Sequence, residues 1–219
     1  DIPPIPAGAC VSRPGPDRPV SPRPALFFKG TAHRAVGPEA SITVRRDSSL
    51  TAPEAGLGVI LGVEAVIVGY TACTDVTAVD LERSGSGFSS QAKIYAGSCA
   101  VGPCLMTADE LGDPRRLQAR CSVLRGGMAL LSDVTNTAEL RDPVETTIAW
   151  LVRDNPVPPG TAVFIGLGIP DPDAAALQEG DRVEIELEGV GRLGNPVRRP
   201  APKRDTPGPP GGIGLTNVR

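Results

Sequence analysis

Two acidic residues are of the type and in the position that a metal ion would need. Glu54 heads the apolar, glycine-dotted run "AGLGVILG", and Asp75 lies in "GYTACTDVTAVDLE", where an apolar strand runs into a turn or short helix. Carboxylates at strand ends are natural ligands for a hard divalent cation such as Mg²⁺. Asp75 could instead cap the turn that follows it, and the residue types alone favour that cap.

A lysine and the only histidine are the candidate acid–base groups. Lys93 is a single lysine in the neutral stretch "SQAKIYAGSC", where it could pair with a substrate carboxylate or act as a base or Schiff-base amine. His33, in the loop "TAHRAVGPEA", could act as a general base near neutral pH. An ordinary surface lysine and an ordinary loop histidine are the simpler interpretations unless Lys93 faces a pocket.

Composition excludes several classes of protein. The 219 residues are 40% hydrophobic but only 3% aromatic, which favours a β-rich core of Val, Ile, Leu and Ala. A net charge of -3 gives no reason to expect nucleic acid or an anionic membrane as partner, and no apolar stretch approaches membrane-spanning length. Five scattered cysteines without a CxxC pair argue against zinc and against a disulfide framework, and predict buried thiols in a reducing cytoplasm.

Proline density divides the chain into three parts. Residues 1–24 carry eight prolines, which predicts an extended arm without helix or central strand. The basic, Pro- and Gly-rich residues 199–219 predict a flexible tail. Residues 25–198 between them are expected to form one folded domain.

The body is expected to be an α+β fold dominated by β-structure. "DPVETTIAWLVRD" predicts a helix with Asp142 as N-cap, Pro143 at the first position and Glu145 completing a capping box. Strict alternation over 181–191 predicts a strand with Val183, Ile185 and Leu187 facing inward. Further strands are expected at 25–30, 41–46, 117–127 and 161–169, and as a hairpin of 55–62 with 64–75.

Seven segments, in order, resemble the fumarylacetoacetate hydrolase family, most closely its dehydratases of 2-oxo-3-deoxy sugar acids. They are "RPALFFKGTAHRAVGP", "ITVRRDS", "PE" at 53–54, "IVGYTACTDVTAVDLE", "QAKIYAGSCAVGP", "PPGTAVFIGLGI" and "LQEGDRVEIELEGVGRLGNPV". The resemblance covers residues 23 to about 198. It implies a mixed β-roll, a homodimer and one Mg²⁺, or Mn²⁺ or Ca²⁺, per subunit.

The resemblance also implies roles for single residues. The family holds its metal with a Glu-x-Glu pair and an Asp, which match Glu54, Gly56 in place of the second Glu, and Asp75. Lys93 matches the catalytic or substrate-binding lysine, and His33 is the second catalytic candidate. The metal chelates a 2-oxo acid or β-dicarbonyl and stabilises its enolate. Residues expected at the substrate are Lys29, Gly56, Val79 and Leu167.

Departures from the family concentrate at the site. Besides Gly56, Val79 stands for a usual Arg, Ala96 for an Asp, and Ile165 and Leu167 for two Thr, which predicts a more apolar pocket. Glu64, Asp80 or Glu82 could supply a substitute ligand. We expect the ordinary metal-dependent reaction to be lost or weakened, and Glu54, Gly56, Asp75 and Lys93 to share one cavity.

Three functions stay open at this point. The chain could be a metal-dependent lyase or hydrolase of a 2-oxo acid with weakened metal binding. It could be a metal-independent biosynthetic cyclase, isomerase or decarboxylase for an apolar, polyketide-like substrate of secondary metabolism. It could also be a non-catalytic, dimeric partner. The resemblance favours an enzyme that acts on an oxo acid or dicarbonyl compound through enol chemistry.

Overall fold

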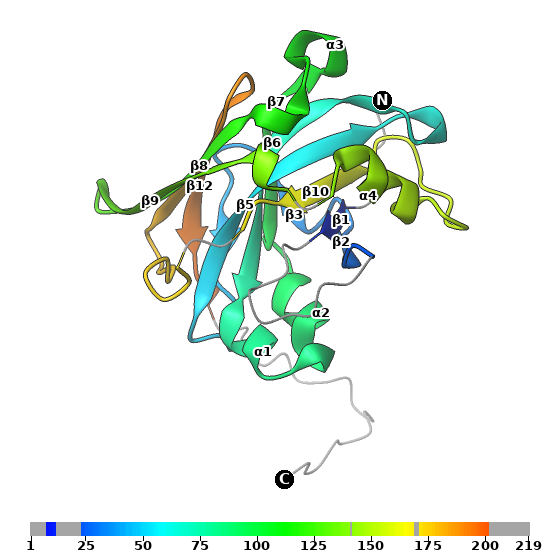
Figure 1. The fold of residues 1–219 in the computed structure, drawn as a ribbon. Helices are drawn as coiled ribbons and strands as arrows, with labels where there is room; N and C mark the ends of the chain where they lie inside the picture. The colour runs from blue at the N-terminus through cyan, green and yellow to red at the C-terminus, as the bar shows by residue number, and fades with distance from the viewer. Residues whose placement is uncertain (1–7, 12–22, 141, 169–170, 202–219) are drawn as a thin grey trace, which may run out of the picture.

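Two β-sheets make up most of the computed structural model, which describes residues 8–11, 23–140, 142–168 and 171–201 (Figure 1). The larger sheet has seven strands in the order β2-β1-β10-β5-β6-β7-β3, and the smaller has five in the order β4-β12-β11-β8-β9. The predicted α+β, β-dominated, single-domain fold is confirmed. The strands of the larger sheet are β1 (Gly8–Val11), β2 (Leu26–Gly30), β3 (Ala35–Val36), β5 (Thr51–Leu61), β6 (Ile67–Ala78), β7 (Cys99–Thr107) and β10 (Ala162–Gly166).

The smaller sheet and the helices complete the domain. The strands of that sheet are β4 (Ile42–Thr43), β8 (Gln118–Arg125), β9 (Met128–Asn136), β11 (Arg182–Leu187) and β12 (Gly191–Arg198). The helices are α1 (Val79–Arg83), α2 (Ser89–Lys93), α3 (Ala108–Leu111) and α4 (Val144–Leu151), with 3₁₀ turns at Val63–Ala65, Ser86–Phe88, Pro114–Arg116 and Thr137–Glu139. Helices α1 and α2 lie together at one end of the domain (Figure 1). None of the described helices is long and apolar enough to cross a membrane.

The β5–β6 hairpin positions the two candidate carboxylates. The predicted hairpin is confirmed, but both strands are longer than expected, and Glu54 lies directly opposite Asp75 in the antiparallel ladder. Asp75 is therefore inside β6 and does not cap a turn, because the β-branched Val76 and Thr77 carry the strand on to Ala78. Opposite residues of such a pair place their Cβ atoms roughly 4.5–5.5 Å apart.

Alternation along β5 separates two faces of the larger sheet. Ala55, Leu57 and Val59 are at most 1% exposed and pack in the main core between the sheets, together with the predicted inward set of β11. Glu54, Gly56 and Gly58 point to the other face, since successive strand residues point to opposite sides. On that second face a smaller cluster forms from Cys73, Cys99, Ala162 and Phe164.

Several predicted elements differ from the structure. The stretch between Pro6 and Pro14 is free of proline and holds β1 between β2 and β10, so the expectation of no central strand before residue 25 is wrong there. Helix α4 begins at Val144 with Pro143 in the N-cap position, one residue later than expected. The sequence patterns do not predict β7, because this strand contains Pro103. The sheet accommodates the proline at the point where the β6–β7 register shifts. The sequence patterns do not predict β9 or β12 either, nor β3, which lies inside the stretch "TAHRAVGPEA" that is expected to be a loop.

Cys73, Cys99, Cys104 and Cys121 are free thiols. Cys73, Cys99 and Cys121 are buried as expected, whereas Cys104 is exposed because that part of β7 lies at the surface. Most of the predicted arm and most of the predicted tail lie outside the described residues, so the predicted domain limits stay predictions.

Candidate active site

Two lysines from distant parts of the chain converge on the two carboxylates. Lys29 comes from β2 and is 1% exposed, while Lys93 is the last residue of α2 and is 3% exposed. Glu54 and Asp75 are each 3% exposed. Burial of four ionisable groups in one place is unusual, because a buried charge requires a partner. We call Lys29, Glu54, Asp75 and Lys93 the ion-pair cluster.

Asp75 is the centre of the ion-pair cluster. Its Oδ1 lies 2.5 Å from Lys29 Nζ, and its Oδ2 lies 3.1 Å from Lys93 Nζ. Lys93 Nζ also donates to Thr77 Oγ1 at 2.7 Å and lies 3.7 Å from Glu54 Oε2. Lys29 Nζ donates in addition to the carbonyl oxygen of Lys93. The ammonium groups thus link three strands and a helix at one point.

The two carboxyls titrate in opposite directions. Burial raises the pKa of Glu54 to about 7; the charge of Lys93 opposes the shift and that of Asp75 adds to it. Burial would also raise the pKa of Asp75, but the ammonium groups of Lys29 and Lys93 outweigh it and lower the pKa to about 2. At neutral pH the site therefore holds a fixed anion at Asp75 beside a carboxyl at Glu54 that takes up and releases a proton.

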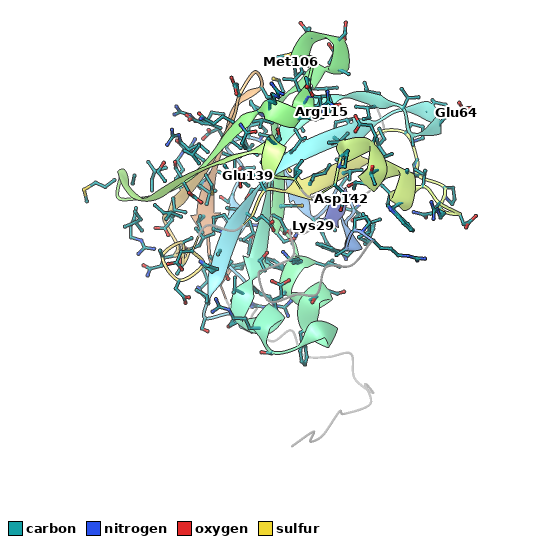
Figure 2. All side chains as sticks on the ribbon, viewed as in Figure 1. Lys29, Glu64, Met106, Arg115, Glu139 and Asp142 are labelled. Carbon is teal, nitrogen blue, oxygen red and sulfur yellow. The ribbon has the colours of Figure 1, made fainter. Side chains whose placement is uncertain are left out.

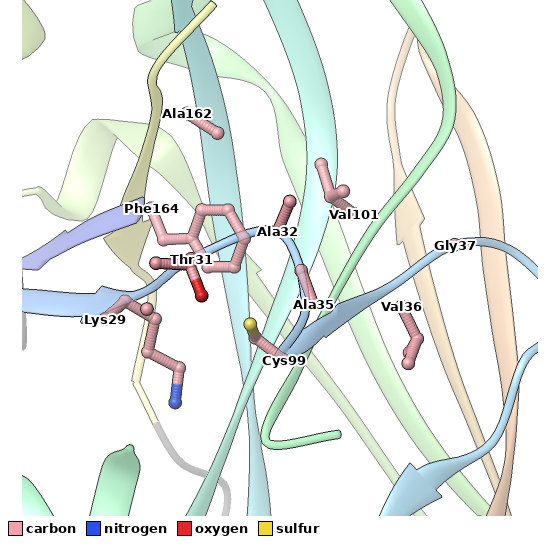
Figure 3. A pocket seen from close by; sticks show the side chains of 11 residues that line it. Lys29, Thr31, Ala32, Ala35, Val36, Gly37, Cys99, Val101, Ala162 and Phe164 are labelled. Carbon is pink, nitrogen blue, oxygen red and sulfur yellow. The ribbon is translucent and has the colours of Figure 1, made fainter. Parts of the chain in front are cut away.

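An apolar pocket lies against the ion-pair cluster. Its volume is about 190 Å³, and the side chains of Lys29 and Cys99 form part of its wall (Figure 3). Cys99 is the ladder partner of Asp75, so pocket and cluster share one face of the sheet. The remaining lining is almost wholly apolar or backbone and consists of Gly30, Thr31, Ala32, Ala35, Val36, Gly37, Val101, Ala162 and Phe164.

Not all candidates reach this site. The structure brings Glu54, Asp75 and Lys93 together with the predicted substrate residue Lys29. Of the residues expected to share one cavity, however, neither these three nor Gly56 lines the pocket described above. His33 is exposed in the turn between β2 and β3, and none of the described contacts joins it to the cluster. Val79 and Leu167 are buried in the main core cluster. The catalytic and binding roles predicted for all these residues stay predictions.

The segment after β10 approaches the site through its backbone. Ile165 pairs with Leu57 and shares its face, so it packs into the core between the sheets and does not make the pocket apolar. The N–H of Gly168 instead donates to Glu54 Oε1 at 3.3 Å. The apolar character of the pocket comes from β7 and β10 residues such as Val101 and Phe164.

The donor set does not fit the resident Mg²⁺ that the resemblance implies. Among the described residues no three His, Cys, Asp or Glu side chains converge as metal ligands. Glu64 lies at the tip of the β5–β6 hairpin, away from Lys29 (Figure 2). Asp80 accepts from Ser48 and Ser49. Glu82 is near enough for its charge to raise the pKa of Glu54, but it does not complete a ligand set.

Comparison with known proteins identifies the family. Residues 9–198 match the sequence profile described as fumarylacetoacetate (FAA) hydrolase C-terminal. The chain belongs to this family. Among family members, it is 40% identical over 177 residues to a 2-dehydro-3-deoxy-D-arabinonate dehydratase of Saccharolobus solfataricus, covering 81% of this chain and 59% of that protein. The chain thus spans about three-fifths of the length of that curated relative.

Other family members carry different activities. A mitochondrial oxaloacetate tautomerase of Xenopus laevis is 31% identical over 192 residues, covering 80% of this chain and 59% of the tautomerase. A solved structure of 2-keto-3-deoxy-D-arabinonate dehydratase complexed with magnesium and 2,5-dioxopentanoate superposes with a TM-score of 0.83 at 37% identity, covering 91% of this chain and 74% of that one. The family fold is therefore present here, while the magnesium belongs to the dehydratase.

A second feature of the sequence, in addition to the resemblance, marks Lys29 as a site residue. The chain has only three lysines, at positions 29, 93 and 203, among 22 basic residues. In a composition that otherwise uses arginine, a lysine is a candidate for a place where a compact ammonium is needed. Two of the three stand in the ion-pair cluster.

Proposed function

We propose that this chain is the catalytic domain of an enzyme that acts on a small 2-oxo acid or β-dicarbonyl compound through an enol or enolate. The observation that carries the proposal is the ion-pair cluster beside an apolar pocket, with Lys29 belonging to both. Family membership supports it, because the relatives named above are a dehydratase and a tautomerase. The whole enzyme's substrate and reaction are part of the proposal.

Lys29 and Lys93 are the groups that would hold the substrate's oxygens. An ammonium carries three donors, and Lys29 has two described partners, Asp75 and the Lys93 carbonyl. Its remaining donor can go to a carboxylate or an enolate oxygen in the pocket. Such donors in a dry site stabilise the charge that develops as a C–H bond next to a carbonyl is broken.

Glu54 is the group that would move the proton. Its Oε2 lies 3.7 Å from Lys93 Nζ, so a substrate oxygen held by Lys93 brings the adjacent carbon near this carboxylate. Glu54 would take a proton from that carbon, and the electron pair would move onto the carbonyl oxygen beside the ammonium. Transfer of the proton to the enolate oxygen completes a tautomerisation to the enol, whereas its return to the same carbon restores the keto form and gives only hydrogen exchange.

The pocket favours a short, apolar substrate tail. Its volume of about 190 Å³ is comparable to the roughly 150 Å³ cavity that holds a benzene molecule. Apart from Lys29, Thr31 supplies the only polar side chain among the lining residues described above. A polyhydroxylated sugar acid would leave its hydroxyls without partners there, whereas a short aliphatic 2-oxo acid would not.

Hydrogen exchange tests the proposal. We expect the protein, in D₂O with EDTA, to accelerate exchange at the carbon next to the keto group of pyruvate, 2-oxobutanoate or oxaloacetate, followed by proton NMR. Lys93→Met and Glu54→Gln should each reduce the rate by about 100-fold or more. Arg120→Met, at an exposed position on β8, is the matched control and should leave the rate unchanged.

The absence of accelerated exchange would contradict the proposal. Exchange no faster than buffer for all three compounds, with folded protein, would remove enol chemistry from this site. Borohydride adds a second arm, because it reduces a Schiff base to a stable amine. A substrate-dependent mass increase on Lys29 or Lys93 would assign that lysine to covalent catalysis in place of the ammonium role.

A further inference from the structure

The space for a third carboxylate is filled by a thiol. Gly56 lies opposite Cys73 in the ladder, two residues from the Glu54–Asp75 pair and on the same face. A Cβ placed on Gly56 would come within 2.7 Å of Cys73 Sγ and 3.2 Å of the carbonyl oxygen of Ile165. Cβ contacts under 3.0 Å are essentially never seen, so the thiol or the strand would have to move. No side chain at position 56 can therefore join the present site unchanged.

Cys73 is held firmly in that place. It is 1% exposed and packs with Cys99, Ala162 and Phe164 in the smaller cluster. Its own strand neighbour on that face is Asp75, so the thiol stands beside the ion-pair cluster. A neutral thiol behaves as a small apolar group, and the thiol of Cys73 fills the space above Gly56 between β5 and β6.

Among the described residues of the site, the carboxylate and ammonium charges already balance without a metal. Glu54 and Asp75 supply two negative charges when ionised, and Lys29 and Lys93 supply two positive ones. Both oxygens of Asp75 already face an ammonium, at 2.5 and 3.1 Å. A divalent cation bound to the same oxygens would stand within a few ångströms of both ammonium groups, and only two carboxylates would offset its charge.

We infer that Gly56 and Cys73 together set the metal independence of this site, and that Lys29 takes the position of a resident cation on Asp75. Restoring the carboxylate by Gly56→Glu is then insufficient, because the Cys73 thiol occupies its space. Removing the thiol as well, in Gly56→Glu/Cys73→Ala, recreates room for a third acidic ligand. This inference concerns metal binding and stands whichever reaction the site performs.

Calorimetry with Mn²⁺ and Mg²⁺ on four forms of the protein tests it. Wild type and Cys73→Ala should show no saturable binding at millimolar metal. Gly56→Glu/Cys73→Ala should bind one ion per chain, at least about tenfold more tightly than Gly56→Glu alone. Circular dichroism of each variant confirms that it is folded, since the Ile165 carbonyl must still yield by a few tenths of an ångström.

Three other outcomes of the calorimetry would each overturn one part of the inference. Saturable binding by wild type, within tenfold of the double variant, overturns metal independence. Equal binding by Gly56→Glu and the double variant overturns the role of Cys73. A folded double variant that binds no metal overturns the assignment of position 56.

A variant that leaves β5 untouched keeps the inference testable if the double variant does not fold. Lys29→Met removes the cation from Asp75 Oδ1, so Mn²⁺ should raise the melting temperature of Lys29→Met and leave that of wild type unchanged. No shift in folded Lys29→Met, or the same shift in wild type, contradicts the role of Lys29 as the resident cation. Hydrogen exchange at the substrate is a separate measurement, so failure of the metal test and failure of the enol chemistry are distinguishable.

Discussion

The two faces of the β5–β6 hairpin are stabilised in different ways. On the inner face Leu57 and Val76, both fully buried, pack between the sheets. On the outer face Glu54 and Asp75 are almost as deeply buried, but they are held by ammonium groups. Apolar packing tolerates the loss of one contact among many, whereas a buried charge depends on one or two partners. The same two strands therefore carry a redundant core and a site in which each residue is needed.

The largest expected effect comes from breaking an ion pair on the outer face. Lys29→Met leaves Asp75 without its 2.5 Å partner and should lower the free energy of unfolding by about 3–5 kcal/mol. Urea denaturation followed by circular dichroism measures it. Lys29→Met/Asp75→Asn removes both charges and should recover most of the loss. A loss below about 1 kcal/mol in the single variant would show that the pair adds little.

Truncation of a side chain should lower the free energy of unfolding more on the inner face of the hairpin than on its outer face. Leu57→Ala removes a fully buried side chain from the inner face and should cost about 2–5 kcal/mol. Cys73→Ala, its counterpart on the outer face, removes one atom and should cost about 1 kcal/mol. Urea midpoints of the two variants give the comparison. Equal losses would mean that the outer face is packed as tightly as the core.

Isosteric replacement of two threonines on β6 should change the free energy of unfolding in opposite directions. Thr74 and Thr77 are both fully buried, but Thr74 faces the core, where its hydroxyl has no hydrogen-bond partner among the described residues, and Thr77 accepts from Lys93 at 2.7 Å. Thr74→Val should raise the free energy of unfolding by about 1 kcal/mol, and Thr77→Val should lower it by a similar amount. Thermal melting measures both, and shifts of the same sign would contradict the assignment of the faces.

The smallest effect concerns Asp80, just beyond the end of β6. Burial would raise its pKa, but donors from Ser49 and Ser48 outweigh it and lower the pKa to about 2. A lowered folded-state pKa stabilises the protein above the ordinary value of 3.8, and this contribution is lost as the pH falls towards 2. The difference in unfolding free energy between wild type and Asp80→Asn should be constant above about pH 5 and shrink below it. A difference that stays constant down to pH 2 would contradict this titration.

The sequence patterns predict the positions of the strands better than they predict which side chains are in contact. Alternation located β11, two apolar runs joined through "GVE" located the hairpin, and the family motifs located Glu54, Asp75 and Lys93. The resemblance predicts Ile165 in the pocket, but its pairing with Leu57 places it on the core side of the sheet. The pairing of Lys29 with Asp75 depends on sheet order, which no local pattern contains. The scarcity of lysine is the one signal in the sequence, apart from the resemblance, that marks Lys29.

The opposition of Glu54 and Asp75 also restricts how the chain can misfold. A slip of one residue in either strand would turn its alternating set over and carry a carboxylate into the apolar layer between the sheets. That carboxylate would have no ammonium there, at a cost of several kcal/mol. Gly56 and Gly58 leave β5 with few side chains on its outer face to fix the alignment of the hairpin. The two acids therefore disfavour every slip of the hairpin by an odd number of residues, in addition to their part in the site.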